Sequence, residues 1–548
     1  MILALALFLR VFSLTHHDVY TDEALLAFRA IGLIDYDAAF IQTTPWQWFP
    51  TVPWWARLSF HDHPILFFLL EHWSMSLLGV NLIAVRLPAV LAGVGSVAII
   101  YLIGKRLAGE KAGLIAASLL AVSSYHVWVS RVGLQDGVVI FFTMLTLWLV
   151  MKAREDDPRW WLAAGASLGL GIITKYSILI IVPVILWYAL VYRWKFYRAR
   201  AFWLGCLAVF LIMTPSWLYN LKLYQARGHF DFQISAFLSQ AVPEWSVRFG
   251  RSLTGGPKDR AINFFRALHQ GGSPVFNGLA LVGVLGGIAA LWKRRDKAAL
   301  FLLGTIILFF LWFLVIGSTY RFVVMVVPVL ALLIARFISH FPFPISHYLS
   351  LITLVIFLLF ELFYSTNSFL LKQPIGRVNI TYAQVNEETQ NFGFNQLEDY
   401  LRNLLAGKMP KFAGTPEYQF IVAEQTDARA RFKRAGREPY PVLIIYEKDL
   451  NFLASLWIFT RRLIYEGWPI ISDAEFVRLT GGQYDQFYRA QGIEKFVYIA
   501  SASPRVIRPV FDRVGKSEAL GQYLKEKGVE PTVIHNRAGE QAFWVYHF

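Results

Sequence analysis

An acidic pair, Asp22 and Glu23, follows the first apolar run of the chain and is the first place where chemistry could sit. A carboxylate here can act as a general base that takes a proton from a hydroxyl or an amine. It can also have a structural purpose, because Thr21 would be the N-cap of a helix whose first turn holds both carboxylates near the positive end of the helix dipole. Both interpretations place the pair at the start of a helix.

A second polar cluster, His61-Asp62-His63-Pro64, opens the apolar run 64–80. Imidazole and carboxylate side chains are ligands for zinc and other divalent cations, so such a cation is compatible with this part of the chain. The His-x-His spacing is short and no helical His-x-x-x-His pair accompanies it, which favours scattered loop histidines, and we assign no metal ligand. The side chains weighed for this site are His16, His17, Asp18, His61, Asp62 and His63.

The composition is that of a polytopic membrane protein. Of 548 residues, 56% are hydrophobic, and the mean hydropathy of +0.46 is too high for a soluble globule. The net charge of +15 would indicate nucleic acid in a soluble domain, but here much of the excess lies in short loops between apolar runs. The single cysteine, Cys206, excludes a disulfide framework within the chain.

Charge decides how the apolar runs cross the membrane. If 64–80 lies in the interface, every basic cluster falls on one side, as the positive-inside rule requires, and about 11 spans result with the N-terminus inside. The first run, Met1–Leu14, is short for a span but lacks the features of a removed leader. The other expected spans are 85–104, 111–130, 137–152, 159–175, 177–193, 201–219, 275–292, 298–317, 321–338 and 347–366.

The chain therefore divides into a membrane domain, 1–367, and a C-terminal domain, 368–548, outside the membrane. Two external loops, 15–84 and 220–274, belong to the membrane domain. The tail alternates short apolar strands with amphipathic helices, which indicates a small α/β domain. Strands are expected at 418–422, 442–446, 495–499 and 543–546, and helices near 395–406, 450–464 and 516–527.

Several motifs occur in the order found in a known family. The motif Val85-Arg86-Leu87-Pro88 opens the expected span 85–104. The motif Ser130-Arg131-Val132-Gly133-Leu134-Gln135-Asp136 precedes the expected span 137–152, and residues 168–175 read LGLGIITK. With the acidic pair and the His-Pro motif, this layout resembles the polyprenyl-phosphate-dependent glycosyltransferases of the C-type fold, such as protein O-mannosyltransferases and lipid A aminoarabinose transferases. The resemblance covers residues 1 to about 220, with Tyr320-Arg321 as a further match.

The resemblance implies a role for each matched residue. Asp22 would be the general base for an acceptor that attacks the anomeric carbon with inversion, and Glu23, about 100° round the helix, would support it. Cations near the outer face would receive the leaving phosphate. These cations are Arg86, Arg131, Lys175 and Arg321, while Asp136 would orient a basic or sugar group and Asp62 and His63 would line the sugar or acceptor side.

The four cations expected to hold the leaving phosphate, here called the phosphate clamp, also have simpler structural interpretations. Arg131 and Asp136 could form a salt bridge that closes a short loop, and Lys175 and Arg86 could extend to the interface as anchors. No cofactor is implied beyond a compatible divalent cation. The partners implied are a polyprenyl-phosphate sugar donor, the lipid bilayer and a protein, lipid or glycan acceptor, without nucleic acid.

The expected function is transfer of one sugar from that donor at the outer face of the cytoplasmic (inner) membrane, where cytosolic nucleotide sugars do not reach. A transporter or lipid flippase is the alternative, but transporters place ionisable residues near the midplane, whereas Asp22, Asp62, Arg131 and Asp136 map to the outer rim. In a third interpretation the C-terminal domain is the catalytic part and the apolar runs only anchor it in the membrane. The absence of a recognisable nucleophile or metal motif from that domain argues against this interpretation.

Overall fold

The computed structural model describes residues 1–548 except 40–41, 246–254, 341–346, 412–415, 481–485 and 508–518. The chain forms two compact units. Unit 1 comprises Met1–Leu14, Phe40–Gln42 and Pro53–Glu387, and unit 2 comprises Thr15–Ala39, Thr43–Val52 and Glu388–Phe548. The segment that carries the acidic pair thus belongs to the unit of the C-terminal domain, whereas the sequence assigns it to an external loop of the membrane domain.

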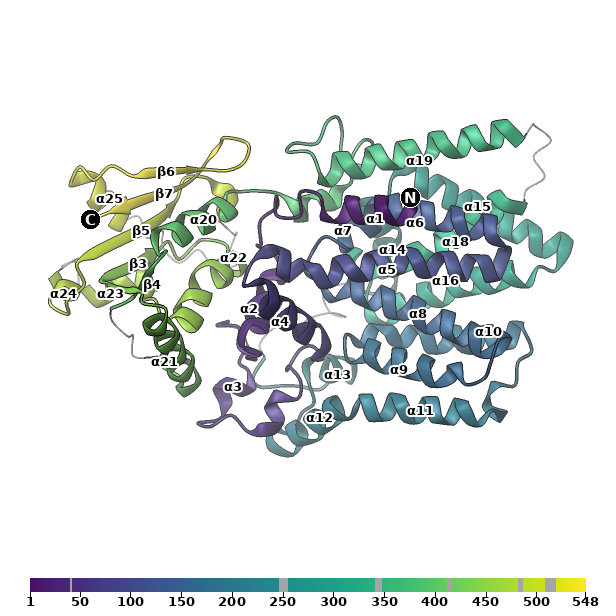
Figure 1. Ribbon diagram of the computed structural model, residues 1–548, viewed down its shortest axis with the longest axis horizontal. Coiled ribbons are helices and arrows are strands. Elements are labelled where there is room, and N and C mark those ends of the chain that lie inside the picture. The colour runs from purple at the N-terminus through teal and green to yellow at the C-terminus, as the bar shows by residue number, and fades with distance from the viewer. Residues whose placement is uncertain (40–41, 246–254, 341–346, 412–415, 481–485, 508–518) are drawn as a thin grey trace. The chain divides into compact units, whose positions relative to one another are not determined.

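Unit 1 is helical, with long apolar helices running side by side (Figure 1). Its elements are α1 (Ile2–Val11), η1 (Trp54–Arg57), α4 (Leu66–Leu78), α5 (Leu82–Ala108), α6 (Glu110–Val122), α7 (Ser124–Val129), α8 (Gln135–Glu155), α9 (Trp160–Ile172), η2 (Tyr176–Ile180), α10 (Ile181–Val191), η3 (Phe196–Arg198), α11 (Arg200–Ile212), α12 (Thr214–Arg227), α13 (Phe232–Phe237), α14 (Pro257–Gly271), α15 (Pro274–Arg294), α16 (Lys297–Ile316), α17 (Tyr320–Val323), η5 (Val324–Val326), α18 (Val327–His340) and α19 (His347–Phe369). A further turn, η6 (Gln384–Thr389), spans the division between the units.

Each expected membrane run contains helix, but the helices differ in length. Among the described residues, 6 helices are long and apolar enough to cross a membrane, or up to 7 if the pair α11 and α12, bent by 50°, is one span. The expected runs at 1–14, 159–175 and 177–193 form shorter apolar helices. The protein is therefore a polytopic membrane protein, and the count of about 11 spans stays a prediction. Helix α4 has 13 residues, fewer than the roughly 20 that a crossing needs.

Small residues allow close packing of these helices. A methyl group added at Gly165 of α9 would lie 2.1 Å from the carbonyl oxygen of Gly205 on α11, so only glycine lets the two backbones approach this far. Helix–helix contacts of this kind are typical of membrane proteins, where apolar surface alone drives no association between helices.

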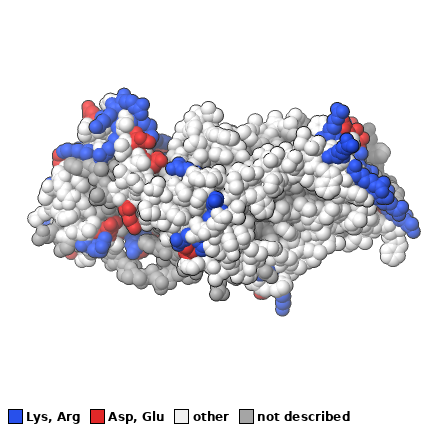
Figure 2. All heavy atoms as spheres, turned by 90° about the horizontal axis from the view of Figure 1, so that it is seen from below, with Lys and Arg blue, Asp and Glu red and all other residues white. Residues whose placement is uncertain are grey.

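The basic clusters meet at one end of unit 1. Arg106 at the end of α5 pairs with Glu155 at 2.7 Å and Asp156 at 2.6 Å after α8, and Arg336 of α18 pairs with Asp296 before α16. Figure 2 shows a broad band free of charged side chains across the helices of unit 1, bounded at one end by Lys and Arg side chains with a few acidic side chains among them. The loop from α10 to α11 at that end exposes Arg193, Lys195, Arg198 and Arg200 (Figures 1 and 2). This is the arrangement on which the positive-inside prediction depends.

Unit 2 is an α/β unit. Its helical elements are α2 (Asp22–Gly32), α3 (Pro45–Trp48), α20 (Phe394–Leu404), α21 (Gln419–Arg434), α22 (Phe452–Ser455), the π-helical turns η7 (Leu456–Thr460) and η8 (Arg462–Glu466), α23 (Asp473–Thr480), α24 (Gln486–Arg489), η9 (Pro504–Val506) and α25 (Ala519–Glu526). Its strands are β1 (Lys408–Pro410), β2 (Glu438–Tyr440), β3 (Val442–Tyr446), β4 (Ile470–Ser472), β5 (Lys495–Ser501), β6 (Thr532–His535) and β7 (Gln541–His547).

Five of these strands form one sheet in the order β4-β3-β5-β7-β6, and β1 and β2 form a separate parallel pair. Strands β4, β3 and β5 are parallel, with Ile444 of β3 opposite Val497 of β5, whereas β7 runs antiparallel to β5 and β6. The run Val442–Ile445 is buried throughout, as expected for a central parallel strand covered on both faces.

The predictions for the tail are confirmed at three strands and corrected at one. Strands occur at 442–446, 495–501 and 541–547, and helices at 394–404, 452–466 and 519–526, while 516–518 lie outside the described residues. The strand expected at 418–422 is wrong, because α21 begins at Gln419. Ile421, Gln425 and Ala428 are its buried positions, which is the spacing of a helix face.

Candidate functional site

The predicted catalytic pair lies in unit 2, at the start of α2. Thr21 is the N-cap in extended conformation, but its side chain accepts no capping hydrogen bond. Asp22 is exposed, whereas Glu23 is 1% exposed. The two carboxylates therefore face different surroundings, as the helical offset predicts, and Asp22 is the one that is accessible to solvent. Both occupy the first turn, where the helix dipole favours negative charge.

Asp18 fixes the chain just before α2. Its carboxylate accepts main-chain N–H bonds from Phe392 at 2.6 Å, Gly393 at 3.0 Å, Phe394 at 3.1 Å and Asn395 at 2.8 Å. These groups form the N-terminal end of α20, so Asp18 satisfies donors that the helix cannot satisfy itself. Asp18, weighed from sequence as a metal ligand, is therefore a helix cap. It holds the segment before the acidic pair within unit 2.

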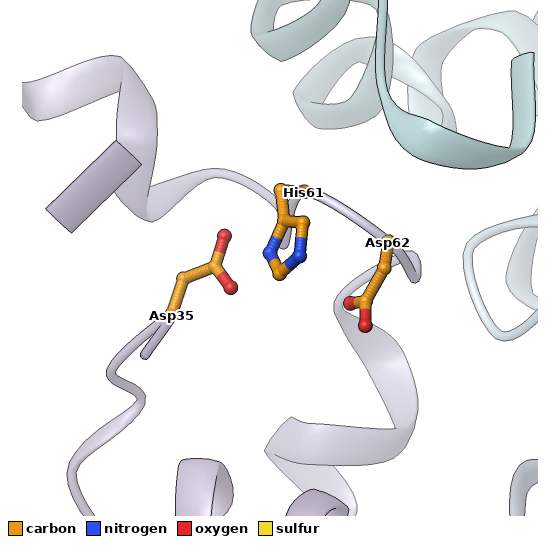
Figure 3. A group of neighbouring side chains, drawn as sticks. All are labelled: Asp35, His61 and Asp62. Carbon is orange, nitrogen blue, oxygen red and sulfur yellow. The ribbon is translucent and has the colours of Figure 1, made fainter. Parts of the chain in front are cut away.

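His61, Asp62 and His63 occupy the turn before α4 in unit 1. The Nδ1 atom of His63 lies 3.1 Å from Oδ1 of Asp62, and His61 and Asp62 are buried. Figure 3 shows the imidazole of His61 and the carboxylate of Asp62 projecting from consecutive positions of this turn, and it also draws Asp35 of unit 2. His61 and Asp62 belong to a group of imidazole and carboxylate side chains that could hold a divalent cation.

Lys175 and Asp136 form a buried ion pair at the ends of α9 and α8. The Nζ atom of Lys175 lies 2.7 Å from Oδ1 of Asp136, and the side chains are 9% and 2% exposed. The same Nζ lies 4.6 Å from the ring centre of Phe322, next to Arg321 on α17. The structure thus brings together Lys175, Asp136 and the helical turn that carries Arg321. Lys175 does not extend to solvent, which corrects the anchor interpretation.

An apolar pocket lies one helical turn beyond this ion pair. Ile140 follows Asp136 by one turn on α8, and Met325 follows Phe322 by three residues. Of the two polar lining residues, Thr143 donates to the carbonyl of Val139 at 2.7 Å and Thr305 to that of Phe301 at 2.8 Å. The lining comprises Ile103, Ile140, Thr143, Met144, Leu147, Ile181, Val184, Thr305, Phe309, Met325, Pro328, Val329 and Leu332.

Arg86 and Arg131, expected in the phosphate clamp, bind the C-terminal end of α1. Arg131 donates to the carbonyls of Leu9 at 2.7 Å, Phe12 at 2.9 Å and Ser13 at 3.1 Å, and Arg86 donates to Leu14 at 2.5 Å. Among the described residues, Arg131 does not pair with Asp136, so the expected salt bridge between them is wrong. A guanidinium at a helix C-terminus is stabilised by the dipole and satisfies carbonyls that lack partners.

Arginine side chains also donate to main-chain carbonyls at other helix ends in unit 1. Arg10 donates to the carbonyls of Ala121 at 3.1 Å and Leu120 at 3.3 Å, near the end of α6. Arg260 donates to those of Leu314 at 2.9 Å and Val315 at 3.2 Å, near the end of α16. Local sequence patterns did not indicate Arg10 or Arg260 in this role, because the acceptors are distant main-chain atoms.

The sequence reasoning also missed Asp231, which is buried in the external loop of unit 1. Burial raises the pKa of this carboxyl, and hydrogen bonds from Ile234, Asn220 and Tyr176 oppose that shift. The one signal available was its position as a capping residue, three residues before Ile234 in a short apolar stretch.

The comparisons with known proteins agree with the resemblance. Residues 62–219 match the family described as dolichyl-phosphate-mannose-protein mannosyltransferase. Over 159 residues the chain is 31% identical to YkcB of Bacillus subtilis (strain 168), a proposed mannosyltransferase. The match covers 28% of this chain and 22% of that protein, so it concerns a segment of each.

The whole chain is similar in fold to ArnT from Cupriavidus metallidurans. The structure of ArnT bound to undecaprenyl phosphate gives a TM-score of 0.55 at 14% identity, over 99% of this chain and 97% of that chain. Its apo structure gives 0.54 at 13% identity, over 99% and 96%. The C-type glycosyltransferase fold expected from the sequence, with its C-terminal α/β domain, is confirmed, and the family resemblance is confirmed in the segment 62–219.

Proposed function

We propose that this protein is a membrane glycosyltransferase that moves one sugar from a polyprenyl-phosphate donor to an acceptor at the outer face of the cytoplasmic membrane. The observation that carries the proposal is the buried pair of Lys175 and Asp136 one turn from an apolar pocket. A buried cation at the end of a bundle of apolar helices suits a ligand with a phosphate head and a hydrocarbon tail. ArnT, which shares the fold, was solved with such a lipid bound.

The phosphate end of the donor would meet Lys175 and Arg321. The ammonium of Lys175 donates to Oδ1 of Asp136 at 2.7 Å, and an ammonium with three N–H donors can contact more than one oxygen, so a phosphate oxygen could bind beside the carboxylate. As the bond from the anomeric carbon to the phosphate oxygen breaks, negative charge grows on the leaving phosphate, and fixed cations stabilise it. Arg86 and Arg131 would act indirectly by holding the end of α1.

Asp22 would be the base on the acceptor side. The acceptor oxygen or nitrogen attacks the anomeric carbon, its proton passes to the Asp22 carboxylate, and the electron pair of the broken bond leaves with the polyprenyl phosphate. A single displacement inverts the configuration of the sugar. Glu23, which is buried on the same helical turn, would support α2. Asp62 and His63 would line the sugar side, and His61 with Asp62 could contribute ligands to a divalent cation.

The location of the reaction follows from the charge pattern. The basic end of unit 1 would face the cytoplasm, so the ends of α1, α6 and α16 and the C-terminal domain would face outward. Nucleotide sugars are confined to the cytoplasm, so a lipid must bring the sugar to that face. The acceptor would be a protein, lipid or glycan of the cell envelope.

Incubation of the purified full-length protein with labelled polyprenyl-phosphate mannose, glucose and arabinose tests the proposal. We expect protein-dependent release of polyprenyl phosphate from one of these donors, with the anomeric configuration inverted in the product by NMR. Turnover of nucleotide sugars without turnover of any lipid donor would contradict it. Lys175→Ala, with Lys195→Ala at the basic end as matched control, should lose release selectively.

A further inference from the structure

Main-chain hydrogen bonds join three segments of unit 1 around the predicted site. The N–H of Leu66, at the start of α4, donates to the carbonyl of Ile173 at 2.8 Å, which connects the turn after His63 to the turn before Lys175. The second connection comes from α13. The N–H of Phe232 donates to the carbonyl of His61 at 2.7 Å, and the side-chain amide of Gln233 donates to the carbonyl of Asp62 at 2.7 Å.

The third connection passes through Asp231, which is 2% exposed. Its Oδ1 atom accepts the N–H of Ile234 at 2.9 Å and so caps α13. Its Oδ2 atom accepts the hydroxyl of Tyr176 at 2.8 Å and the side-chain amide of Asn220 at 2.9 Å. The N–H of Asp231 in turn donates to Oδ1 of Asn220 at 2.8 Å.

These bonds close a ring. Tyr176 directly follows Lys175, Phe232 directly follows Asp231, and the segment 61–66 is bonded to both sides. We propose that Asp231 is a positioning residue that holds the turn carrying Lys175 and the loop carrying Asp62 in fixed register with each other. The inference rests on the proposed function in one respect, because the consequence for catalysis assumes that Lys175 meets the donor phosphate.

The chemistry requires a carboxylate at this position. One oxygen is used by the cap of α13, and the other accepts from two donors at once, which an ionised oxygen does well. Asparagine has one acceptor oxygen, so in Asp231→Asn that oxygen can keep the cap or accept from Tyr176 and Asn220, but not both, and a neutral NH₂ group can only replace the charge-assisted bond to the Tyr176 hydroxyl by a weaker one. Because asparagine is a strong N-cap residue, the variant should keep α13 and turn its NH₂ group toward the amide of Asn220. The substitution therefore separates capping from positioning.

The matched set of variants is Asp231→Asn, Tyr176→Phe and Asp157→Ala. Tyr176→Phe removes the hydroxyl that donates to Asp231, together with its hydrogen bonds to Asn220 and Ser216, and leaves the cap of α13 in place. Asp157 accepts the N–H of Arg159 at 2.8 Å at the opposite end of α9, so its loss removes a comparable bond on the same helix without touching the ring. All three are made in the full-length protein and compared by hydrogen exchange and by kinetics.

Hydrogen exchange tests the ring independently of activity. We expect faster exchange at 173–177 in Asp231→Asn and Tyr176→Phe, with 419–434 of α21 unchanged, and wild-type exchange at 173–177 in Asp157→Ala. Unchanged exchange at 173–177 in both ring variants would overturn the proposal. This result does not depend on whether the protein transfers sugar, so failure of the proposed function is recognised separately by a wild-type protein that releases no polyprenyl phosphate.

Kinetics test the positioning of Lys175. A displacement of about 1 Å at a catalytic group lowers rates by as much as about 100-fold, so we expect kcat/KM for the donor to fall about 10- to 100-fold in both ring variants. The affinity for polyprenyl phosphate should fall together with kcat/KM for the donor, whereas KM for the acceptor should stay within about twofold of the wild-type value. A merely structural role would change acceptor and donor alike, and equal losses for both would overturn the proposal.

Discussion

The ammonium of Lys175 lies 2.7 Å from the carboxylate of Asp136, and both side chains are withdrawn from solvent. A charge pair of this kind is costly to break, because the partner that remains is a buried charge without compensation. The pair ties α8 to the end of α9, beside Phe322. The position of the Lys175 side chain therefore depends on Asp136.

Asp136→Asn should lower stability and donor use together. Loss of one partner of a buried pair costs about 3 to 5 kcal/mol, so we expect a lower melting temperature and a marked fall in kcat/KM for the lipid donor. Glu155→Gln is the control, because its pair with Arg106 is largely exposed and worth at most about 1 kcal/mol. Equal melting temperatures of the two variants would show that the pair of Lys175 and Asp136 is not the buried contact described.

Arg131→Ala distinguishes a helix-end role from a phosphate clamp. The substitution leaves the carbonyls of Leu9, Phe12 and Ser13 without this donor, and each unsatisfied buried group costs about 1 to 3 kcal/mol. We expect strong destabilisation and faster hydrogen exchange at 9–14, measured against the exposed Arg193→Ala. An Arg131→Ala protein of wild-type stability with weakened binding of polyprenyl phosphate would instead favour the clamp.

Cysteine labelling tests the topology in a Cys206→Ser background, since Cys206 is exposed. An impermeant maleimide added to intact cells should label Leu77→Cys, at a side chain that is 84% exposed, and should reach Lys293→Cys only after permeabilisation. The reason is that the basic clusters share one end of unit 1, which the positive-inside rule predicts to face the cytoplasm. Ready labelling of Lys293→Cys from outside would invert the arrangement.

Acid should loosen unit 2 through Glu398. Its carboxylate lies 2.7 Å from both Arg461 and Arg462, and although burial alone would raise the pKa of Glu398, these arginines hold it at about 2. The stabilisation is complete above the ordinary glutamate pKa of about 4.3 and is lost as the pH falls toward 2. The protection factors for hydrogen exchange at 394–404, which are corrected for the slower intrinsic exchange in acid, should therefore fall from about pH 5 downward.

Glu398→Gln provides the reference for the acid response. It lacks the titrating carboxylate, so the protection factors at 394–404 should be lower than in the wild type at neutral pH and should change less between pH 5 and pH 3. An acid response of the same size in this variant would assign the effect to other groups.

How far the sequence could predict the structure depended on the type of interaction. Apolar runs predicted helices at every expected span, and Val442–Tyr446 was recognised as a strand, because burial in lipid or in a parallel sheet leaves a continuous apolar signal. The segment 418–422 has the same apolar character but becomes the start of α21, where Ile421 packs against Ile464 and Tyr465 in a buried cluster. Packing decided between two local preferences there.

The site residues show the same limit. The position of Asp22 at a helix start and of Lys175 at the end of a span followed from local patterns. The partners of Arg131 and Asp231 did not, because they are main-chain carbonyls and side chains that only the folded chain brings near. The sequence therefore predicted which charged residues are candidates for the site. Only the structure showed which of them could contact a substrate and which hold other parts of the chain in place.

The most direct measurement for the central claim is sugar transfer from a polyprenyl-phosphate donor by Asp22→Asn, beside the wild type and Glu23→Gln. Removal of a general base costs about 10²- to 10⁴-fold in rate, so Asp22→Asn should lose transfer to that extent while its melting temperature and its affinity for polyprenyl phosphate stay at wild-type values. Full transfer by Asp22→Asn at unchanged expression would contradict the assignment of Asp22 and, with it, the site on which the proposed function depends.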